Sequence, residues 1–249
     1  MDLIRKLTGY INIIIYQLQY KYLFSGSIVI VKPGSSCYIE RNVKIVNSKI
    51  TVCSGSTLEI KKNTKINKAV LYVEGKLTVE PDCIIENGDS PGKATILIYN
   101  GGLLEIDNNT RLRCKIWIRY GGKVKIGKYT NINEGTEIRS DDQIHIGDFC
   151  MISYNCVIWD TNTHNIYPDE ERRKLTVNYY PKFGHEIEKP KTAKIYIGND
   201  CWIGREAVIL KGVTIKNSVV VGYRTMLSKG IIEDNKTVIQ DISYRVLDK

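Results

Sequence analysis

The chain has 249 residues, a formal net charge of +9 and 43% hydrophobic residues, which is close to the composition of soluble globular proteins. This composition excludes a disordered, collagen-like or coiled-coil chain as the main architecture. The positive charge suits a polyanionic ligand or an anionic membrane surface. However, the 36 Lys and Arg residues are spread along the whole chain, with no dense basic run beyond 172–174, so no nucleic-acid partner is predicted.

The seven Cys residues form no CxxC pair, and their number is odd. Without a secretion signal, this pattern indicates reduced thiols and a cytoplasmic protein.

The N-terminal residues 1–25 are predicted to form a short helix. Apolar side chains recur there at helical spacing: Ile4, Leu7, Ile11, Ile14, Ile15, Leu18 and Tyr22. The segment is too short and too polar for a transmembrane helix, and it lacks the small-residue cleavage site of a signal peptide. Two interpretations stay open. The helix packs on the body of the fold or on a neighbouring subunit, or it makes peripheral contact with the inner face of the membrane through Arg5, Lys6 and Lys21.

A six-residue repeat dominates the C-terminal part of the chain. Aliphatic residues recur at Ile197, Ile203, Ile209, Ile215, Val221 and Leu227. A small or branched residue follows each of them four places later, beginning with Cys201 and Ala207. A period of six matches neither a helix nor a simple alternating strand. It predicts short strands joined by turns, three of which make one coil of a parallel β-helix, with the aliphatic side chains filling its centre.

The same repeat extends towards the N-terminus in a looser form. Ile126, Ile132, Ile138 and Ile144 continue the six-residue spacing, and related units begin at Gly55, Gly75, Gly101 and Gly121. We therefore predict an all-β fold: a β-helix domain over 26–240, with about eight coils, followed by a tail at 241–249. The Cys residues at the companion positions are expected to be small inward-facing fillers.

One segment, 159–192, breaks the repeat and is predicted to be a loop inserted into the β-helix. A long loop that interrupts a regular solenoid is usually functional. This one carries His164 and His185, which are two of the three histidines in the chain.

Several motifs resemble those of the hexapeptide-repeat acyltransferases, in the branch of galactoside, maltose and surface-polysaccharide O-acetyltransferases. They are Ile197-Gly-Asn-Asp-Cys-Trp-Ile-Gly204, Ala207-Val-Ile-Leu-Lys-Gly-Val-Thr-Ile215, Asn162-Thr-His164-Asn-Ile and Pro168-Asp-Glu-Glu-Arg-Arg173. The resemblance covers roughly 120–232. It implies a left-handed β-helix, a homotrimer with sites between subunits, and acetyl-CoA as co-substrate without a metal. The implied reaction is acetyl transfer to a sugar hydroxyl of a carbohydrate acceptor, in bacterial surface polysaccharide biosynthesis.

The resemblance also implies roles for individual residues. His164 matches the catalytic histidine. The acceptor side is expected to involve Asn133, Asp160, Asn162, His185 and Trp202. The coenzyme A side is expected to involve Trp202, Arg205, Gly222, Tyr223, Arg224 and Lys229. Tyr223 and Arg224 replace the usual small residues, and Gln240-Asp-Ile-Ser243 stands where the family has Gly-Asn-Pro-Ala, so the adenine end of coenzyme A is expected to be held differently.

The chemistry fits this assignment. A sugar hydroxyl is a poor nucleophile, and a neutral imidazole at cytoplasmic pH is a suitable base for it. The backbone N–H of Arg205 is the candidate donor to the developing oxyanion. A loop carbonyl, Asp160 or Asn162 are the open alternatives for holding the other nitrogen of His164. The three histidines do not have the spacing of a zinc enzyme on this fold. The serious alternative is a non-catalytic β-helix with a binding or structural role.

Overall fold

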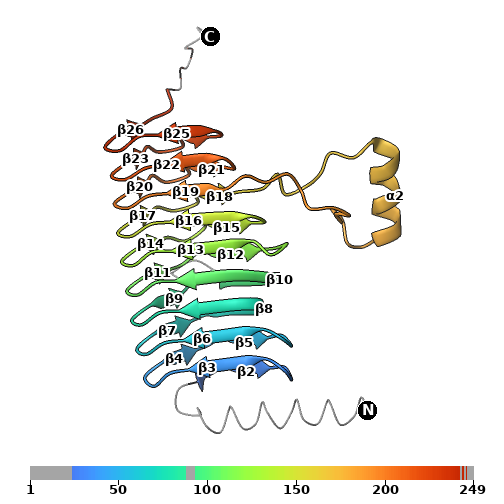
Figure 1. Ribbon diagram of the computed structural model, residues 1–249, viewed down its shortest axis with the longest axis vertical. Helices are drawn as coiled ribbons and strands as arrows, with labels where there is room; N and C mark the ends of the chain where they lie inside the picture. The colour runs from blue at the N-terminus through green and yellow to red at the C-terminus, as the bar shows by residue number, and fades with distance from the viewer. Residues whose placement is uncertain (1–23, 88–92, 242, 244, 246–249) are drawn as a thin grey trace.

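The computed structural model describes residues 24–87, 93–241, 243 and 245, and shows a parallel β-solenoid of about ten turns with one helix (Figure 1). The all-β parallel solenoid agrees with the prediction, but the predicted number of about eight coils is wrong. The helix predicted for 1–25 lies outside the described residues, apart from the last two positions.

The solenoid is a prism with three faces, and all its strand pairs are parallel. Face 1 is a ten-stranded sheet that takes one short strand from each turn. Its strands are β1 (Phe24–Ser25), β4 (Lys44–Val46), β7 (Lys65–Asn67), β9 (Ile84–Glu86), β11 (Arg111–Leu112), β14 (Asn131–Ile132), β17 (Met151–Ile152), β20 (Trp202–Ile203), β23 (Val220–Val221) and β26 (Thr237–Val238).

Faces 2 and 3 belong to one sheet because two long strands, β8 (Ala69–Val79) and β10 (Ala94–Ile106), run across both faces. Face 2 also contains β2 (Ile28–Val31), β5 (Lys49–Val52), β12 (Lys115–Ile118), β15 (Glu137–Ser140), β18 (Val157–Trp159), β21 (Val208–Leu210) and β24 (Met226–Leu227). Face 3 contains β3 (Ser36–Ile39), β6 (Thr57–Ile60), β13 (Lys123–Ile126), β16 (Gln143–Ile146), β19 (Ile195–Ile197), β22 (Val213–Ile215) and β25 (Gly230–Ile232).

The centre of the prism is filled by the aliphatic repeat. Ile132, Ile138 and Ile144 have no exposed surface, and each stacks on its equivalents in the neighbouring turns. The companion positions point inward as well. The Thr130 hydroxyl donates to the carbonyl of Gly147 at 2.8 Å, and Cys156 is fully buried. Burial raises the pKa of the Cys156 thiol, so this residue acts as a core filler and not as a nucleophile.

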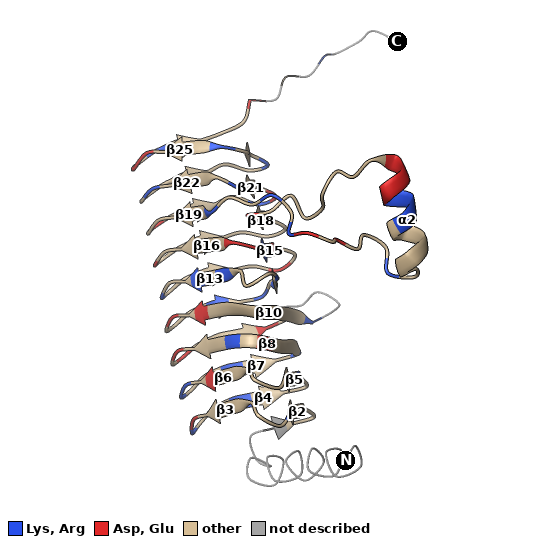
Figure 2. Cartoon of the chain, turned by 45° about the vertical axis from the view of Figure 1, so that its right-hand side comes forward, with Lys and Arg blue, Asp and Glu red and all other residues tan. Residues whose placement is uncertain are grey.

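Residues 160–194 leave the prism at the corner between faces 2 and 3, after β18, and return at β19 (Figures 1 and 2). This segment contains α2 (Asp169–Tyr179), which the sequence analysis missed because the segment was interpreted as an irregular loop. None of the residues of α2 is buried, so the helix has no apolar stripe that a periodicity could reveal. Three acidic residues in its first turn, Asp169, Glu170 and Glu171, favour the positive end of the helix dipole.

Candidate active site

His164 lies in the segment between β18 and α2, and a carboxylate holds its ring. Its Nδ1 is 2.7 Å from Oε1 of Glu186, which returns from the far side of α2. The His164 side chain is 55% exposed, whereas the side chain of Glu186 is only 5% exposed. The pair therefore joins an accessible imidazole to a nearly buried carboxylate. Glu186 is not among the site residues predicted from the sequence.

Glu186 is held as a carboxylate by several donors. Its Oε2 accepts hydrogen bonds from the backbone and side-chain nitrogens of Asn165, at 3.0 and 2.9 Å, and from the Tyr167 hydroxyl at 3.1 Å. Burial alone would raise the pKa of Glu186. The hydrogen bonds from Asn165, His164 and Tyr167 outweigh it, so the pKa is lowered below its ordinary value. An ionised carboxylate only accepts hydrogen bonds, so the proton between the two residues belongs to His164 Nδ1, and in the neutral imidazole the lone pair is then on Nε2.

Gly184 lies directly against the imidazole ring of His164. Its backbone has φ of +70°, and a Cβ atom there would lie 2.8 Å from Cε1 of His164. A side chain at this position would therefore push the ring away, in addition to the strain of the left-handed conformation.

Gly184→Ala is accordingly expected to lower kcat about tenfold or more, because a displacement of the ring by a fraction of an ångström weakens its alignment. Gly34→Ala is the matched control, since Gly34 has a similar φ of +76° but nothing within 4 Å of its added Cβ. Steady-state kinetics of both purified variants checks the prediction, and equal effects of the two substitutions would contradict it.

The base of the inserted segment is fixed by buried charges. Asp160 is fully buried, and it accepts hydrogen bonds from the Ser140 hydroxyl at 2.7 Å and from the backbone N–H groups of Asp141 and Asp142 at 2.8 and 3.0 Å. Burial raises the pKa of Asp160 despite these donors. Asp160 therefore anchors the segment and does not face the cavity beside His164.

A second buried carboxylate continues this anchor up to the residue before His164. Asp141 forms a two-pronged ion pair with Arg119, at 2.9 and 2.7 Å, and accepts a hydrogen bond from the Thr161 hydroxyl. Arg119 also reaches the carbonyl of Thr163 at 3.3 Å. Thr163 has φ of +65°, a conformation that is costly for a β-branched residue. The network thus fixes the direction in which the chain delivers His164.

Two cavities, of about 270 and 310 Å³, touch His164. The first lies between His164 and α2 and is also lined by Arg172 and His185. His185 stacks on Tyr179 with ring centroids 3.7 Å apart, so it also ties α2 to the returning chain. The second cavity is lined by Asn162, whose backbone N–H donates to the carbonyl of Lys191. Asn162 and His185 therefore both lie beside His164.

The remaining candidate residues lie elsewhere on the prism. Most of them are at the corner between faces 1 and 2. There Asn133 accepts a hydrogen bond from Arg113, and Arg205 pairs with Glu206 at 3.2 Å. Arg224 also binds Glu206, at 2.6 Å, and its guanidinium covers the ring of Tyr223.

Three more of the predicted site residues are Gly222, Trp202 and Lys229. A Cβ atom added to Gly222 would lie 2.9 Å from Cγ2 of Ile239 in the next turn, so this glycine allows close packing of turns. Trp202 lies on face 1 and is 51% exposed. Lys229 is exposed at the corner between faces 2 and 3, two turns beyond the inserted segment.

A single chain therefore does not assemble all the predicted residues in one place. His164, Asn162, His185 and Lys229 belong to the corner between faces 2 and 3. Asn133, Arg205 and the 222–224 turn belong to the corner between faces 1 and 2, and face 2 separates the two groups.

Two further observations concern metals and membranes. Within the described ranges, no group of three or more His, Cys, Asp or Glu side chains is placed to hold a metal ion. No helix in the part of the chain that the structure describes has the length and apolar character needed to cross a bilayer.

Comparison with known proteins identifies the class to which this chain is similar. No family model matches the sequence. The chain is 28% identical over 128 residues to a galactoside O-acetyltransferase of Lactococcus lactis. It is 26% identical over 127 residues to the putative colanic acid biosynthesis acetyltransferase WcaF of Escherichia coli. Each match covers 51% of this chain, and they cover 55% and 60% of those two relatives, so the chain spans little more than half of their length.

Among solved structures, the polySia-specific acetyltransferase NeuO is similar over 87% of this chain and 71% of its own, with 21% identity and a TM-score of 0.49. The curated relatives confirm the predicted resemblance to hexapeptide-repeat acyltransferases.

Proposed function

We propose that the protein is an O-acetyltransferase that moves an acetyl group from acetyl-CoA to a sugar hydroxyl, with His164 as the general base. The observation that carries the proposal is the His164–Glu186 pair, an exposed imidazole held by an ionised and nearly buried carboxylate. It stands in the one segment that interrupts the described solenoid. Acetyltransferase relatives, one of them named for colanic acid biosynthesis, support acyl transfer and a role in surface polysaccharide synthesis.

The proposed mechanism follows from the proton on Nδ1. Glu186 keeps that proton in place, so Nε2 accepts the proton of the sugar hydroxyl as its oxygen attacks the thioester carbonyl. The imidazolium that forms is stabilised by the adjacent carboxylate, as in other His–carboxylate pairs. The tetrahedral intermediate then collapses by breaking the carbon–sulfur bond, and the leaving thiolate takes the proton from the imidazolium, so the products are the acetylated sugar, the free thiol of coenzyme A and neutral His164. Because the thioester is already activated, this direct transfer needs no covalent enzyme intermediate. The backbone N–H of Arg205 is proposed as the oxyanion donor.

A complete site then needs a second copy of the chain. The proposed base and the proposed oxyanion donor lie at different corners of one prism, with face 2 between them. The inserted segment, residues 160–194, extends well away from its own solenoid (Figure 1). We therefore propose a homotrimer in which this segment of one subunit reaches the corner between faces 1 and 2 of the next, so that acetyl-CoA and acceptor bind between subunits.

Light scattering of the purified protein is expected to give a mass near 85 kDa, three times the 28.4 kDa of one chain. Subunits that carry His164→Ala should be mixed with subunits that carry Arg224→Glu, a substitution at the corner between faces 1 and 2. Part of the activity should return, because some mixed trimers contain a site with an intact His164 from one subunit and an intact corner from the other. A monomer at micromolar concentration would rule out the shared site.

The enzyme is proposed to act in the cytoplasm through a β-helix domain over 26–240. The role of the N-terminal helix, as a packing element or as a membrane contact, stays a prediction.

The competing hypothesis is a non-catalytic β-helix that has a binding or structural role. Titration calorimetry with coenzyme A separates the two. Acetyl-CoA consumption with β-galactosides and with colanic acid, chosen because relatives carry those names, then tests the reaction. No coenzyme A binding would favour the non-catalytic hypothesis.

A further inference from the structure

The corner between faces 1 and 2 is shorter in one turn than in the turns above it. On either side of this corner, inward-facing aliphatic residues are six positions apart at Ile132 and Ile138, and again at Ile152 and Ile158. At Leu112 and Ile116 they are only four positions apart. With two residues fewer, the chain takes a tighter path, and the corner recedes beneath the wider turns. We call this recess, at residues 113–115, the notch.

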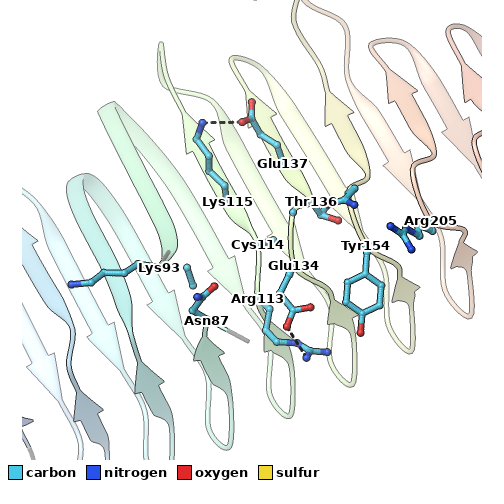
Figure 3. A pocket seen from close by; sticks show the side chains of 13 residues that line it. Asn87, Lys93, Arg113, Cys114, Lys115, Glu134, Thr136, Glu137, Tyr154 and Arg205 are labelled. Atoms are coloured by element: carbon cyan, nitrogen blue, oxygen red, sulfur yellow. Dashed lines mark hydrogen bonds and ion pairs between the residues drawn. The ribbon is translucent and has the colours of Figure 1, made fainter. Parts of the chain in front are cut away.

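The notch opens into the largest cavity described at this corner, about 600 Å³, which is within the range of small-molecule sites. Figure 3 shows its lining side chains coming from successive turns, from Asn87 at one end to Arg205 at the other. These ends belong to turns β9 and β20, so the cavity runs along the axis of the solenoid for roughly 19 Å, at about 4.8 Å for each of the intervening steps. It is thus a groove that leads to the proposed acetyl-transfer corner.

Arg113 forms the floor of the notch and connects it with the proposed acceptor site. Its side chain is 16% exposed; one terminal nitrogen donates to Glu134 at 2.9 Å, and the other donates to Asn133. Its Nε is buried and has no hydrogen-bond partner among the described residues. A buried N–H without an acceptor is costly, so the Arg113 side chain is not fully satisfied within the described residues.

Three more charged side chains at the notch form a paired cluster, while Lys93 lines the cavity without an ion pair among the described residues. Lys115 binds Glu137 at 2.8 Å, and Arg139 binds the same carboxylate. Burial would raise the pKa of Glu137, but Lys115 and Arg139 outweigh it and lower the pKa. The lining is therefore polar, with paired carboxylates and the unpaired ammonium of Lys93 available to hydroxyl groups, and it lies beside the ring of Tyr154, which is 43% exposed. Polar and charged groups beside an exposed aromatic ring suit the hydroxyl groups and the apolar ring faces of a sugar.

We propose that the notch binds the sugar units next to the one that is acetylated, so that the acceptor is an oligosaccharide or polysaccharide and not a free monosaccharide. This inference rests on the proposed function and extends it by naming the acceptor class. The groove has Arg205, the proposed oxyanion donor, at one end, passes Arg113, which donates to Asn133, and continues over turns that a single sugar would not reach.

Glycan binding to the full-length protein tests the proposal, with galacto-oligosaccharides of graded length and depolymerised colanic acid as probes. The wild type is expected to bind the longer members of at least one series more tightly than the monosaccharide. Tyr154→Ala and Lys93→Ala should reduce that advantage about tenfold, the equivalent of one lost contact. Tyr38→Ala, which removes a similarly exposed ring on face 3, should not change it.

Inserting two residues after Arg113 restores the longer corner, and this variant should bind long glycans no more tightly than the monosaccharide. If the insertion variant does not fold, the Tyr154→Ala and Lys93→Ala variants still test the proposal. The proposal is overturned if no series binds better with length, or if the variants leave the advantage unchanged. It is also overturned if Tyr154→Ala weakens coenzyme A binding by the same factor. His164→Ala separates this outcome from the proposed function, since it should bind the long glycans normally yet fail to acetylate them.

Discussion

Replacing His164 with alanine is expected to lower kcat at least a hundredfold. General-base catalysis contributes about 10² to 10⁴ in rate, so its loss raises the barrier by roughly 3 to 5 kcal/mol. The affinity for acetyl-CoA should stay within several-fold of the wild type, because the base acts in the transition state and not in ground-state binding. The solenoid should remain intact, since the His164 side chain is more than half exposed and lies outside the strand ladders.

His145→Ala is the control for this prediction. His145 lies on β16 of face 3, away from the inserted segment, and stacks on Tyr196 with ring centroids 4.8 Å apart. Its removal costs one surface contact and should leave turnover nearly unchanged. The assignment of the base is wrong if folded His164→Ala protein acetylates at a near wild-type rate, or if His185→Ala is the variant that abolishes turnover.

The solenoid was predictable from the sequence because its core repeats a simple physical requirement. Every turn needs an aliphatic side chain at each inward position, and Ile197, Ile203 and Ile209 show this at a constant spacing. The number of turns was underestimated where the corners change length. Ile45 and Ile50 are five positions apart and Leu112 and Ile116 are four, so a search for a period of six loses the count in the N-terminal half.

The site was only half predictable, for a related reason. His164 stood out because it follows the point where the repeat stops. Glu186 follows 22 positions later, beyond a helix with no buried residue, and no periodicity links the two. Asp160 and Asn162 are nearer in sequence and were the natural alternatives. The first turns inward to bind Ser140 and the backbone of the corner that follows β15, and only the second lies beside His164.

The inserted segment is fixed where it leaves the prism and exposed at its far end, where α2 lies. The buried Asp160 and Asp141 fix the start of the segment to the prism, and Thr161 pairs antiparallel with Thr192 where the chain returns. Beyond this clamp, α2 stands clear of the solenoid. The proposed catalytic side chain next to this clamp keeps its direction, while the exposed helix is proposed to shape the acceptor side.

Glu186→Gln is expected to lower kcat about a hundredfold without unfolding the protein. Glutamine has nearly the same shape, but its amide offers both a donor and an acceptor, and a donor facing Nδ1 would move the imidazole proton to Nε2, where it blocks base catalysis. The loss should appear in kcat more than in KM, because the proposed role of Glu186 is to hold the imidazole and not to bind the substrates. Nitrogen-15 NMR of the three histidines reads the tautomer directly, with His145 and His185 as internal references. The proposed role of Glu186 fails if His164 in the variant keeps its proton on Nδ1, or if the tautomer changes while turnover does not.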